Sequence, residues 1–331
     1  MKTKMLAVAF CLVFISFSSI RAKDIGDFKF LYQVKNNEAK VMKASVQSEQ
    51  GKFLLWEKGK IIAKDVANAN GWNKYLDFSP EDLGIRMEEE NAVKILVPGD
   101  INGLTYDTKN KKLAFLMHLG DSVNSLLAIE DVSKNKVVYS NSAKIHPMVP
   151  GRRIEFMAIE TLNLPACFSD DGKYVAYGAY TYLYVDNVEI LDLENRTKTV
   201  IHNASSPVFW KDKLFYQVRD EKKKTTSLYS TSFPKLKNEL FIVLNDKTVN
   251  TTFYKGIYYA MTDTGIWACA LGGEKKFIQV ADIKAADLLT EKATVGKFFI
   301  ATSGNKDYIY VLLRVMFENK IEYKMYAKEI I

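Results

Sequence analysis

The chain has 331 residues, of which 48% are hydrophobic and 26% are charged, and its formal net charge is +7. This composition excludes an intrinsically disordered chain, because disorder requires few hydrophobic residues and a high net charge. The positive excess is small and spread along the sequence, so it predicts no clustered basic surface for nucleic acid.

The first 22 residues have the pattern of a secretory signal peptide. Lys2 and Lys4 form a short positive region, residues 5–17 are uncharged and mostly apolar, and small or polar residues follow up to Ala22. An apolar run of this length is shorter than the roughly 20 residues that cross a bilayer, so a cleaved leader is favoured over a membrane anchor. We expect a signal peptide at 1–22 and a single domain at 23–331, in the periplasm or outside the cell.

The region before Val97 contains segments that look like strands but share no clean register. They lie at 28–34, 41–46, 53–56 and 75–87. Residues 78–84 contain an expanded form of the Asp-Gly turn that recurs at Asp171-Gly172. No long helical pattern is present in this region or after it.

Two stretches in the middle of the chain share one pattern of short strands. The first runs from Leu104 to Tyr139 and the second from Cys167 to Ile201. In the second stretch, alternating apolar residues flank Asp171-Gly172, a pair that favours a tight turn because glycine tolerates positive φ and aspartate bonds to nearby backbone. We interpret Asp170 and Asp171 as turn residues rather than as a catalytic carboxylate pair.

Weaker copies of the pattern follow, and their spacing predicts the fold. The equivalent positions are Ala114, Ala176, Phe215, Tyr258 and Phe299. Consecutive positions in this series are 62, 39, 43 and 41 residues apart. The first interval is long because an insertion lies between Ser142 and Asn163. A period of about 40 residues with four short strands is typical of a propeller blade. We therefore predict an all-β fold, a single β-propeller of four-stranded blades. Two blades from the amino-terminal region would give seven in total, with six as the alternative.

The best-preserved unit also resembles a known family. Phe168-Ser-Asp-Asp-Gly-Lys-Tyr-Val-Ala-Tyr177, followed by Val188-Glu-Ile-Leu-Asp-Leu193, is similar to the TolB-like repeat. In that repeat Phe-Ser-Pro-Asp-Gly-Lys precedes an apolar strand and an Asp-Leu strand end, and Asp170 stands where the family has proline. The resemblance implies a propeller fold and no particular activity.

The candidate binding residues come from connections that a propeller brings to one rim. Connections from second to third strands and from fourth to next first strands emerge on the same side of the ring. We assign the insertion to the connections from a fourth strand to the next first strand. The connections from a second to a third strand are assigned to the segments 119–124, 180–186, 262–265 and 303–307. Paired arginines bind carboxylate, sulfate or phosphate groups well. We therefore predict an anionic group at a rim site formed by His146, Arg152, Arg153 and Tyr182.

The sequence predicts no catalytic residue, metal site or cofactor. Its three histidines have no neighbour at metal-ligand spacing, and Cys167 and Cys269 fall on different predicted blades, so we expect two unpaired, buried thiols. We expect a monomeric binding or scaffold protein that engages a protein, a peptide or a glycan through one face of the ring. The alternative is a secreted hydrolase or lyase acting on polysaccharide or a small ester, with catalytic groups contributed by several blades.

Overall fold

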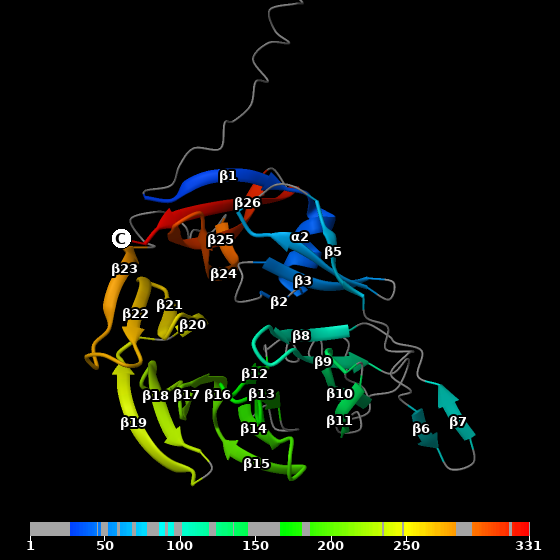
Figure 1. Cartoon of the computed structure of the whole chain (residues 1–331). Helices are drawn as coiled ribbons and strands as arrows, with labels where there is room; N and C mark the ends of the chain where they lie inside the picture. The colour runs from blue at the N-terminus through cyan, green and yellow to red at the C-terminus, as the bar shows by residue number, and fades with distance from the viewer. Residues whose placement is uncertain are drawn as a thin grey trace, which may run out of the picture.

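The computed structural model describes most of the chain after the predicted leader. The described residues are 27–44, 46–47, 52–57, 60–67, 71–77, 86–89, 92–95, 101–118, 124–134, 136–144, 166–180, 186–233, 235–246, 248–282, 293–317 and 320–330. Six four-stranded antiparallel sheets surround a common axis, so the chain forms a single β-propeller as predicted (Figure 1).

Each sheet runs outward from the axis in the order of its strands. The first five are β2 (Val46–Gln47), β3 (Lys52–Glu57), β4 (Lys60–Asp65), β5 (Asn73–Asp77); β8 (Ile101–Asp107), β9 (Lys112–His118), β10 (Asn124–Asp131), β11 (Lys136–Lys144); β12 (Cys167–Phe168), β13 (Tyr174–Tyr180), β14 (Asp186–Asp192), β15 (Thr197–His202); β16 (Ser205–Trp210), β17 (Lys213–Asp220), β18 (Thr225–Ser232), β19 (Lys237–Leu244); and β20 (Thr248–Tyr254), β21 (Ile257–Thr262), β22 (Gly265–Ala270), β23 (Ile278–Asp282).

The last sheet joins the two ends of the described chain. It contains β24 (Ala293–Ser303), β25 (Lys306–Phe317), β26 (Lys320–Glu329) and, outermost, β1 (Lys29–Val34). Phe28, next to β1, is 1% exposed and belongs to the apolar cluster between this sheet and the preceding one. The amino-terminal strand therefore closes the ring.

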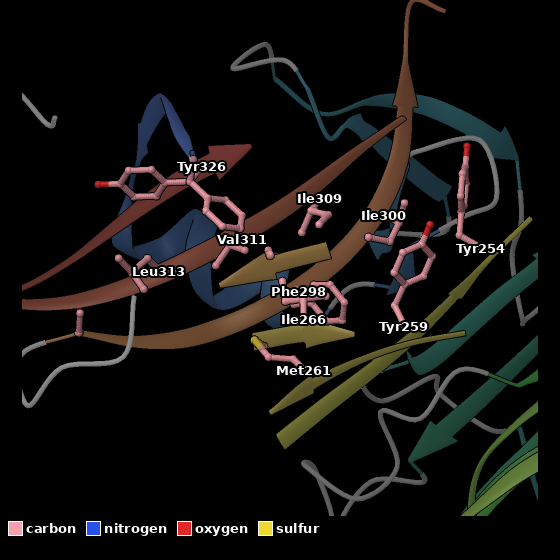
Figure 2. Packing of buried hydrophobic residues seen from close by; sticks show 13 residues of the cluster. Tyr254, Tyr259, Met261, Ile266, Phe298, Ile300, Ile309, Val311, Leu313 and Tyr326 are labelled. Atoms are coloured by element: carbon pink, nitrogen blue, oxygen red, sulfur yellow. The ribbon is translucent and has the colours of Figure 1, made fainter. Parts of the chain in front are cut away.

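That apolar cluster shows how neighbouring sheets pack. Residues of β24 and β25, such as Phe298 and Ile309, lie against Tyr259 and Met261 of β21 (Figure 2). Alternation along each strand directs these side chains into the space between sheets, and burying them stabilises the fold by about 25 cal/mol per Å² of apolar surface.

A recurring backbone hydrogen bond confirms most of the predicted repeat. In four sheets the amide that follows the third strand donates to a carbonyl at the start of the second strand. The pairs, each at 2.9 Å, are Val132 to Lys111, Leu193 to Lys173, Leu271 to Gly256 and Ile330 to Asp307. The predicted second strands around Ala114, Ala176, Phe215 and Tyr258 are β9, β13, β17 and β21, as expected.

The predicted register of the last unit is wrong. Phe299 lies on β24, the first strand of its sheet, and β25 is the second strand. Residues 304–305 consequently connect a first strand to a second strand, so the segment 303–307 lies on the opposite rim from the one predicted. The sequence misled because the third strand is β26 and the fourth comes from the other end of the chain, leaving only three local strands to compare with a four-strand repeat.

The amino-terminal region differs from its prediction in two ways. Residues 46–77 contribute one four-stranded sheet, while β6 (Arg86–Glu89) and β7 (Ala92–Ile95) form a two-stranded hairpin at the periphery (Figure 1). The count of seven blades therefore stays a prediction. The segment predicted as a strand at 41–46 lies mostly in helix α2 (Asn36–Ala44), because Ala39 and Met42, one turn apart, are both fully buried.

Helix α2 crosses from the outermost strand of the last sheet to the innermost strand of the first, and two lysines hold it. The ammonium of Lys64, 1% exposed, pairs with Glu38 in the first turn of the helix. Lys297 Nζ donates to the carbonyl of Met42 near the carboxyl end, at 3.2 Å, where the helix dipole favours a cation. Burial lowers the pKa of Lys64, and it lowers the pKa of Lys297 to about 8.

Both cysteines in the described part of the chain are unpaired, as predicted. Cys269 is buried and Cys167 is half-buried. Burial raises the pKa of the Cys167 thiol to about 12, so little thiolate forms there near neutral pH. Helix α2 is too short to span a membrane, and none of the described helical segments meets that requirement.

Two glycines with positive φ provide a test of packing between sheets. A Cβ on Gly256, at φ +77°, would lie 2.5 Å from Cζ2 of Trp210, whereas one on Gly304, at φ +62°, would meet nothing within 4 Å. We expect Gly304→Ala to lower the free energy of unfolding by about 1 kcal/mol through backbone strain alone. Gly256→Ala should lower it by about 2–4 kcal/mol, because the indole of Trp210 must also move. Urea denaturation measures both, and equal costs would contradict the described contact.

Candidate functional site

Strand connections divide the ring into two rims. The lower rim carries connections from first to second and from third to fourth strands. The upper rim carries connections from second to third strands and from fourth to next first strands. The insertion joins β11 to β12, a fourth to a first strand, and 181–185 joins β13 to β14, a second to a third strand. The described strand ends that flank the two connections therefore lie at the upper rim by topology.

The four predicted binding residues lie outside the described residues. His146, Arg152 and Arg153 fall within 145–165, and Tyr182 falls within 181–185. Tyr177 and His202, in the same sheet as the 181–185 connection, are described. Tyr177 is buried and its hydroxyl donates to Glu189 at 2.6 Å, so it is no exposed stacking surface. The ring of His202 lies 3.2 Å from the side-chain oxygen of Asn187.

The structure reveals a buried polar network below the upper rim, between the sheets β16–β19 and β20–β23. Gln217, fully buried on β17, donates from Nε2 to the hydroxyls of Ser205 at 3.0 Å and Ser206 at 2.8 Å. Its Oε1 accepts a 2.8 Å hydrogen bond from the hydroxyl of Tyr258, which comes from the neighbouring sheet. Because both ends of the amide are used, its orientation is fixed and the two sheets are joined.

Burial keeps Tyr258 a neutral donor. The phenol is 3% exposed, and desolvation raises its pKa well above the usual value, while the nearby charge of Arg219 acts in the opposite direction. Tyr258 is therefore protonated at every physiological pH. It serves as a hydrogen-bond donor and not as an acid or base.

Ser206 brings this network to the inner side of the ring. It lies on β16, the innermost strand of its sheet, with φ 50°, at a bulge in the pairing between Ser205 and Val208. Its hydroxyl also accepts a 3.2 Å hydrogen bond from Thr251 on β20, the innermost strand of the next sheet. A left-handed serine costs of order 1 kcal/mol and persists only where its surroundings hold it.

Further hydroxyl groups line the upper ends of the same two sheets. The hydroxyls of Thr226 and Thr248 lie 3.1 Å apart, and Thr264 donates to Asp246 at 2.8 Å. The indole of Trp267 donates to the Thr262 hydroxyl at 3.2 Å. This part of the upper rim is therefore rigid and rich in neutral hydrogen-bonding groups, with the exposed Arg219 beside it.

The arrangement suits polar recognition. Ser206 and Thr251 are half-buried hydroxyls, and Arg219 adds a guanidinium that binds carboxylate or phosphate oxygens in pairs. Within the residues that the structure describes, no group of three or more His, Cys, Asp or Glu side chains could hold a metal ion. One signal in the sequence could have indicated this site: Gln217 is a polar residue inside the apolar run from Leu214 to Val218.

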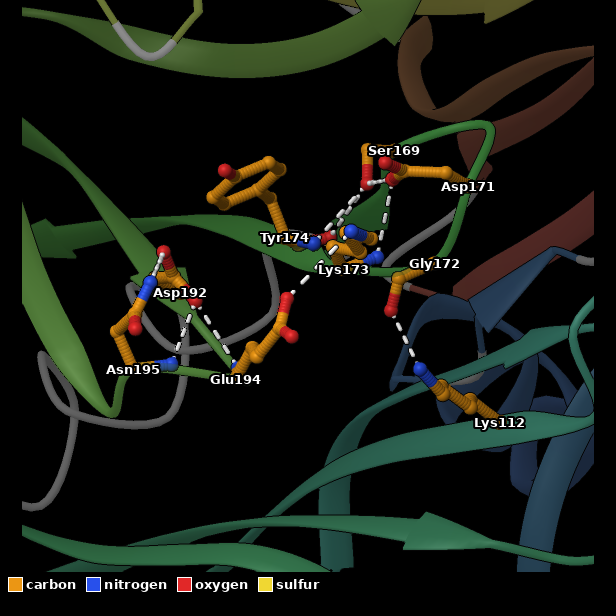
Figure 3. A network of polar contacts seen from close by, with 9 residues as sticks. All are labelled: Lys112, Ser169, Asp171, Gly172, Lys173, Tyr174, Asp192, Glu194 and Asn195. Atoms are coloured by element: carbon orange, nitrogen blue, oxygen red, sulfur yellow. Dashed lines mark hydrogen bonds and ion pairs between the residues drawn. The ribbon is translucent and has the colours of Figure 1, made fainter.

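The lower rim joins neighbouring sheets through turn residues. Lys112 Nζ donates to the carbonyl of Gly172 at 2.5 Å, linking the β8–β9 and β12–β13 turns (Figure 3). Asp171 accepts hydrogen bonds from the Ser169 hydroxyl at 2.6 Å and the Lys173 amide at 3.0 Å, which confirms its predicted role in the turn. Asp192 binds the turn residues Glu194 and Asn195 in the same way, through backbone amides at 2.9 and 2.8 Å (Figure 3).

No protein-family model matches the chain, and no curated protein matches it either. Among solved structures, it is similar to a prolyl endopeptidase at 13% identity and a TM-score of 0.42, over 86% of this chain and 43% of that one. The propeller domain of the trilobed protease from Pyrococcus furiosus is 12% identical, with a TM-score of 0.40, over 70% and 72% of the two chains. An uncharacterized protein from Listeria monocytogenes is 8% identical, with a TM-score of 0.45, over 91% and 83%. The chain thus spans less than half of the prolyl endopeptidase, and similarity at this level assigns no activity.

Removing the Tyr258 hydroxyl tests the network. We expect Tyr258→Phe to lower the free energy of unfolding by about 1–3 kcal/mol, because Oε1 of the buried Gln217 loses its donor. The matched control is Tyr229→Phe, since Tyr229 is half-buried against Tyr216 and its hydroxyl bonds to none of the described residues. The control substitution is expected to lower the free energy of unfolding by less than about 0.5 kcal/mol. Denaturant unfolding measures both variants, and equal effects would show that the network adds no stability.

Proposed function

We propose that residues 23–331 form an exported, non-enzymatic binding propeller that holds a polar ligand at the inner end of the upper rim. The ligand class is a peptide segment, free or within a protein, or a glycan. The observation that carries this proposal is Ser206, a strained, half-buried serine on an innermost strand whose hydroxyl is fixed by both Gln217 and Thr251.

Strain at such a position is an argument for function. A glycine would adopt φ 50° at lower cost, and the serine is held there by hydrogen bonds from two sheets. Both of those bonds end on the serine oxygen, so its own proton can be donated to a ligand at the axis. Hydroxyl donors together with Arg219 match the amide, hydroxyl and carboxylate groups of peptides and glycans.

The insertion and the 181–185 connection extend this proposal. The strands that flank each connection end at the upper rim, and we include His146, Arg152, Arg153 and Tyr182 in the proposed site on that ground. In this proposal the two arginines bind an anionic group of the ligand through paired hydrogen bonds.

The test uses mature protein whose amino terminus, read by mass spectrometry, lies near Lys23. The protein is applied to arrays of short peptides and of neutral and acidic oligosaccharides. We expect saturable binding to one of these classes, weakened about tenfold in Ser206→Gly through loss of one hydrogen bond, and also weakened in the Arg152→Ala, Arg153→Ala double variant.

The control for Ser206→Gly is Lys211→Gly, which relieves a similar positive φ, 55°, on the lower rim. Binding by this control should stay within about twofold of the wild type, because distant surface substitutions have small effects. Cleavage of any probe by the wild-type protein would contradict the proposal, as would unchanged binding by both the Ser206 and the arginine variants.

A further inference from the structure

The lower rim carries lysines in a backbone conformation that lysine rarely adopts. Lys111, Lys211 and Lys255 have φ of 55°, 55° and 47°, and each lies in a connection from a first to a second strand. The left-handed region favours glycine and asparagine, so each lysine is less stable in this conformation than those residues would be. The lower rim thus carries lysine, in turns of three different sheets, where glycine or asparagine would be more stable.

The charge of the described connections of this rim, counted without the strand ends, supports this reading. Within the described connections of the lower rim, ten residues are basic and five are acidic. The basic ones are Lys109, Lys111, Lys134, Lys173, Arg196, Lys211, Lys235, Lys255, Lys275 and Lys276, and the acidic ones are Asp170, Asp171, Glu194, Asp212 and Glu274. The described connections of the upper rim, including helix α2, have six basic and four acidic residues. The net excess is thus +5 on the lower rim and +2 on the upper.

Many of the acidic groups at this rim are occupied by local structure. Asp107, Asp131 and Asp192, which end their strands, accept backbone amides of the following turns. Asp307 pairs with Lys255 at 3.0 Å. Lys111, Lys211 and Lys276, in contrast, are exposed and pair with no acidic group of the described residues. No acidic group of the described residues neutralises their charges, although the ammonium of Lys211 lies 5.8 Å from the ring centroid of Trp210.

The shape of the rim indicates the kind of partner. The connections that carry Lys211 and Lys255 have only two residues each, so their tips project little from the sheets. The basic residues come from consecutive sheets around the ring (Figure 1), and strand order places their connections on one rim. A linear polyanion would follow only an arc of such a rim, whereas a flat anionic surface meets many of these lysines together. Lysine, a flexible point charge, suits such diffuse attraction better than paired hydrogen bonding.

We propose that the lower rim is a docking surface for an anionic lipid bilayer, which it binds peripherally through these lysines. The surface is separate from the polar site of the upper rim, so this proposal stands or fails independently of the proposed function. Each lysine near an anionic bilayer contributes roughly fivefold to affinity, and the attraction weakens as salt rises.

The experiment measures co-sedimentation of the mature protein with vesicles, either phosphatidylcholine alone or phosphatidylcholine mixed with phosphatidylglycerol. The test variant is Lys111→Asn, Lys211→Asn, Lys276→Gln. Asparagine tolerates the left-handed conformation, so this variant should fold at least as stably as the wild type. The matched control removes three charges from the upper rim as Lys35→Gln, Lys222→Gln, Lys224→Asn, and it includes a lysine at φ 52°.

We expect binding to the anionic vesicles only, weakened at least about 20-fold in the lower-rim variant and less than about threefold in the upper-rim control. Equal losses in both variants would overturn the proposal, because they would reflect net charge rather than a defined surface. Absence of binding to anionic vesicles at low salt would also overturn it. Soluble polyphosphate or alginate that binds the rim more tightly than the vesicles would identify a polymer as the partner and overturn it as well.

Discussion

The pairing of β1 with β26 is the constraint on which the rest of the structure depends. Lys29 lies opposite Ala327 and Val34 opposite Tyr323, so the first described strand is the outer edge of the last sheet. Phe28 is buried in the core of that sheet, and the ring of Phe30 meets that of Tyr326 edge-on at 5.7 Å. Without this strand, β26 would be an open edge and the ring would have ends that could separate.

Helix α2 then crosses directly to the first sheet. The Lys64–Glu38 pair fixes the first turn of this helix, because an unpaired charge on the buried Lys64 would be costly.

Closure gives the two rims different chemical roles. On the lower rim, turn residues join sheet to sheet, as Lys112 does with the carbonyl of Gly172. Toward the upper rim, buried side chains join two neighbouring sheets. Gln217 accepts a hydrogen bond from Tyr258 of the next sheet and donates hydrogen bonds to Ser205 and Ser206 of its own sheet. Hydrogen bonds between sheets at both rims hold the inner hydroxyls of Ser206 and Thr251 at fixed positions, which would lower the entropic cost of the ligand binding proposed there.

Sequence reasoning succeeded where the information is local and failed where it is not. The turn at Asp171-Gly172 and the second strands around Ala114, Ala176 and Tyr258 were predictable, because each repeat contains its own turn signals and alternation. The position of Phe299 was mispredicted because the fourth strand of that sheet lies some 300 residues away in the chain. Helix α2 was missed although Ala39 and Met42 have helical spacing. The network around Gln217 joins residues up to 45 positions apart, and only the lone polar residue in an apolar strand indicated it.

Hydrogen–deuterium exchange of the β1 amides tests ring closure most directly. If residues 29–34 are paired with β26, their ladder amides should exchange as slowly as those of β25 and β26, since all must open together. Because slow exchange in β1 requires the amino-terminal strand to be docked in the carboxyl-terminal sheet, it would support closure by this strand. Exchange of β1 at the rate of an unstructured peptide, while β25 and β26 remain protected, would contradict it.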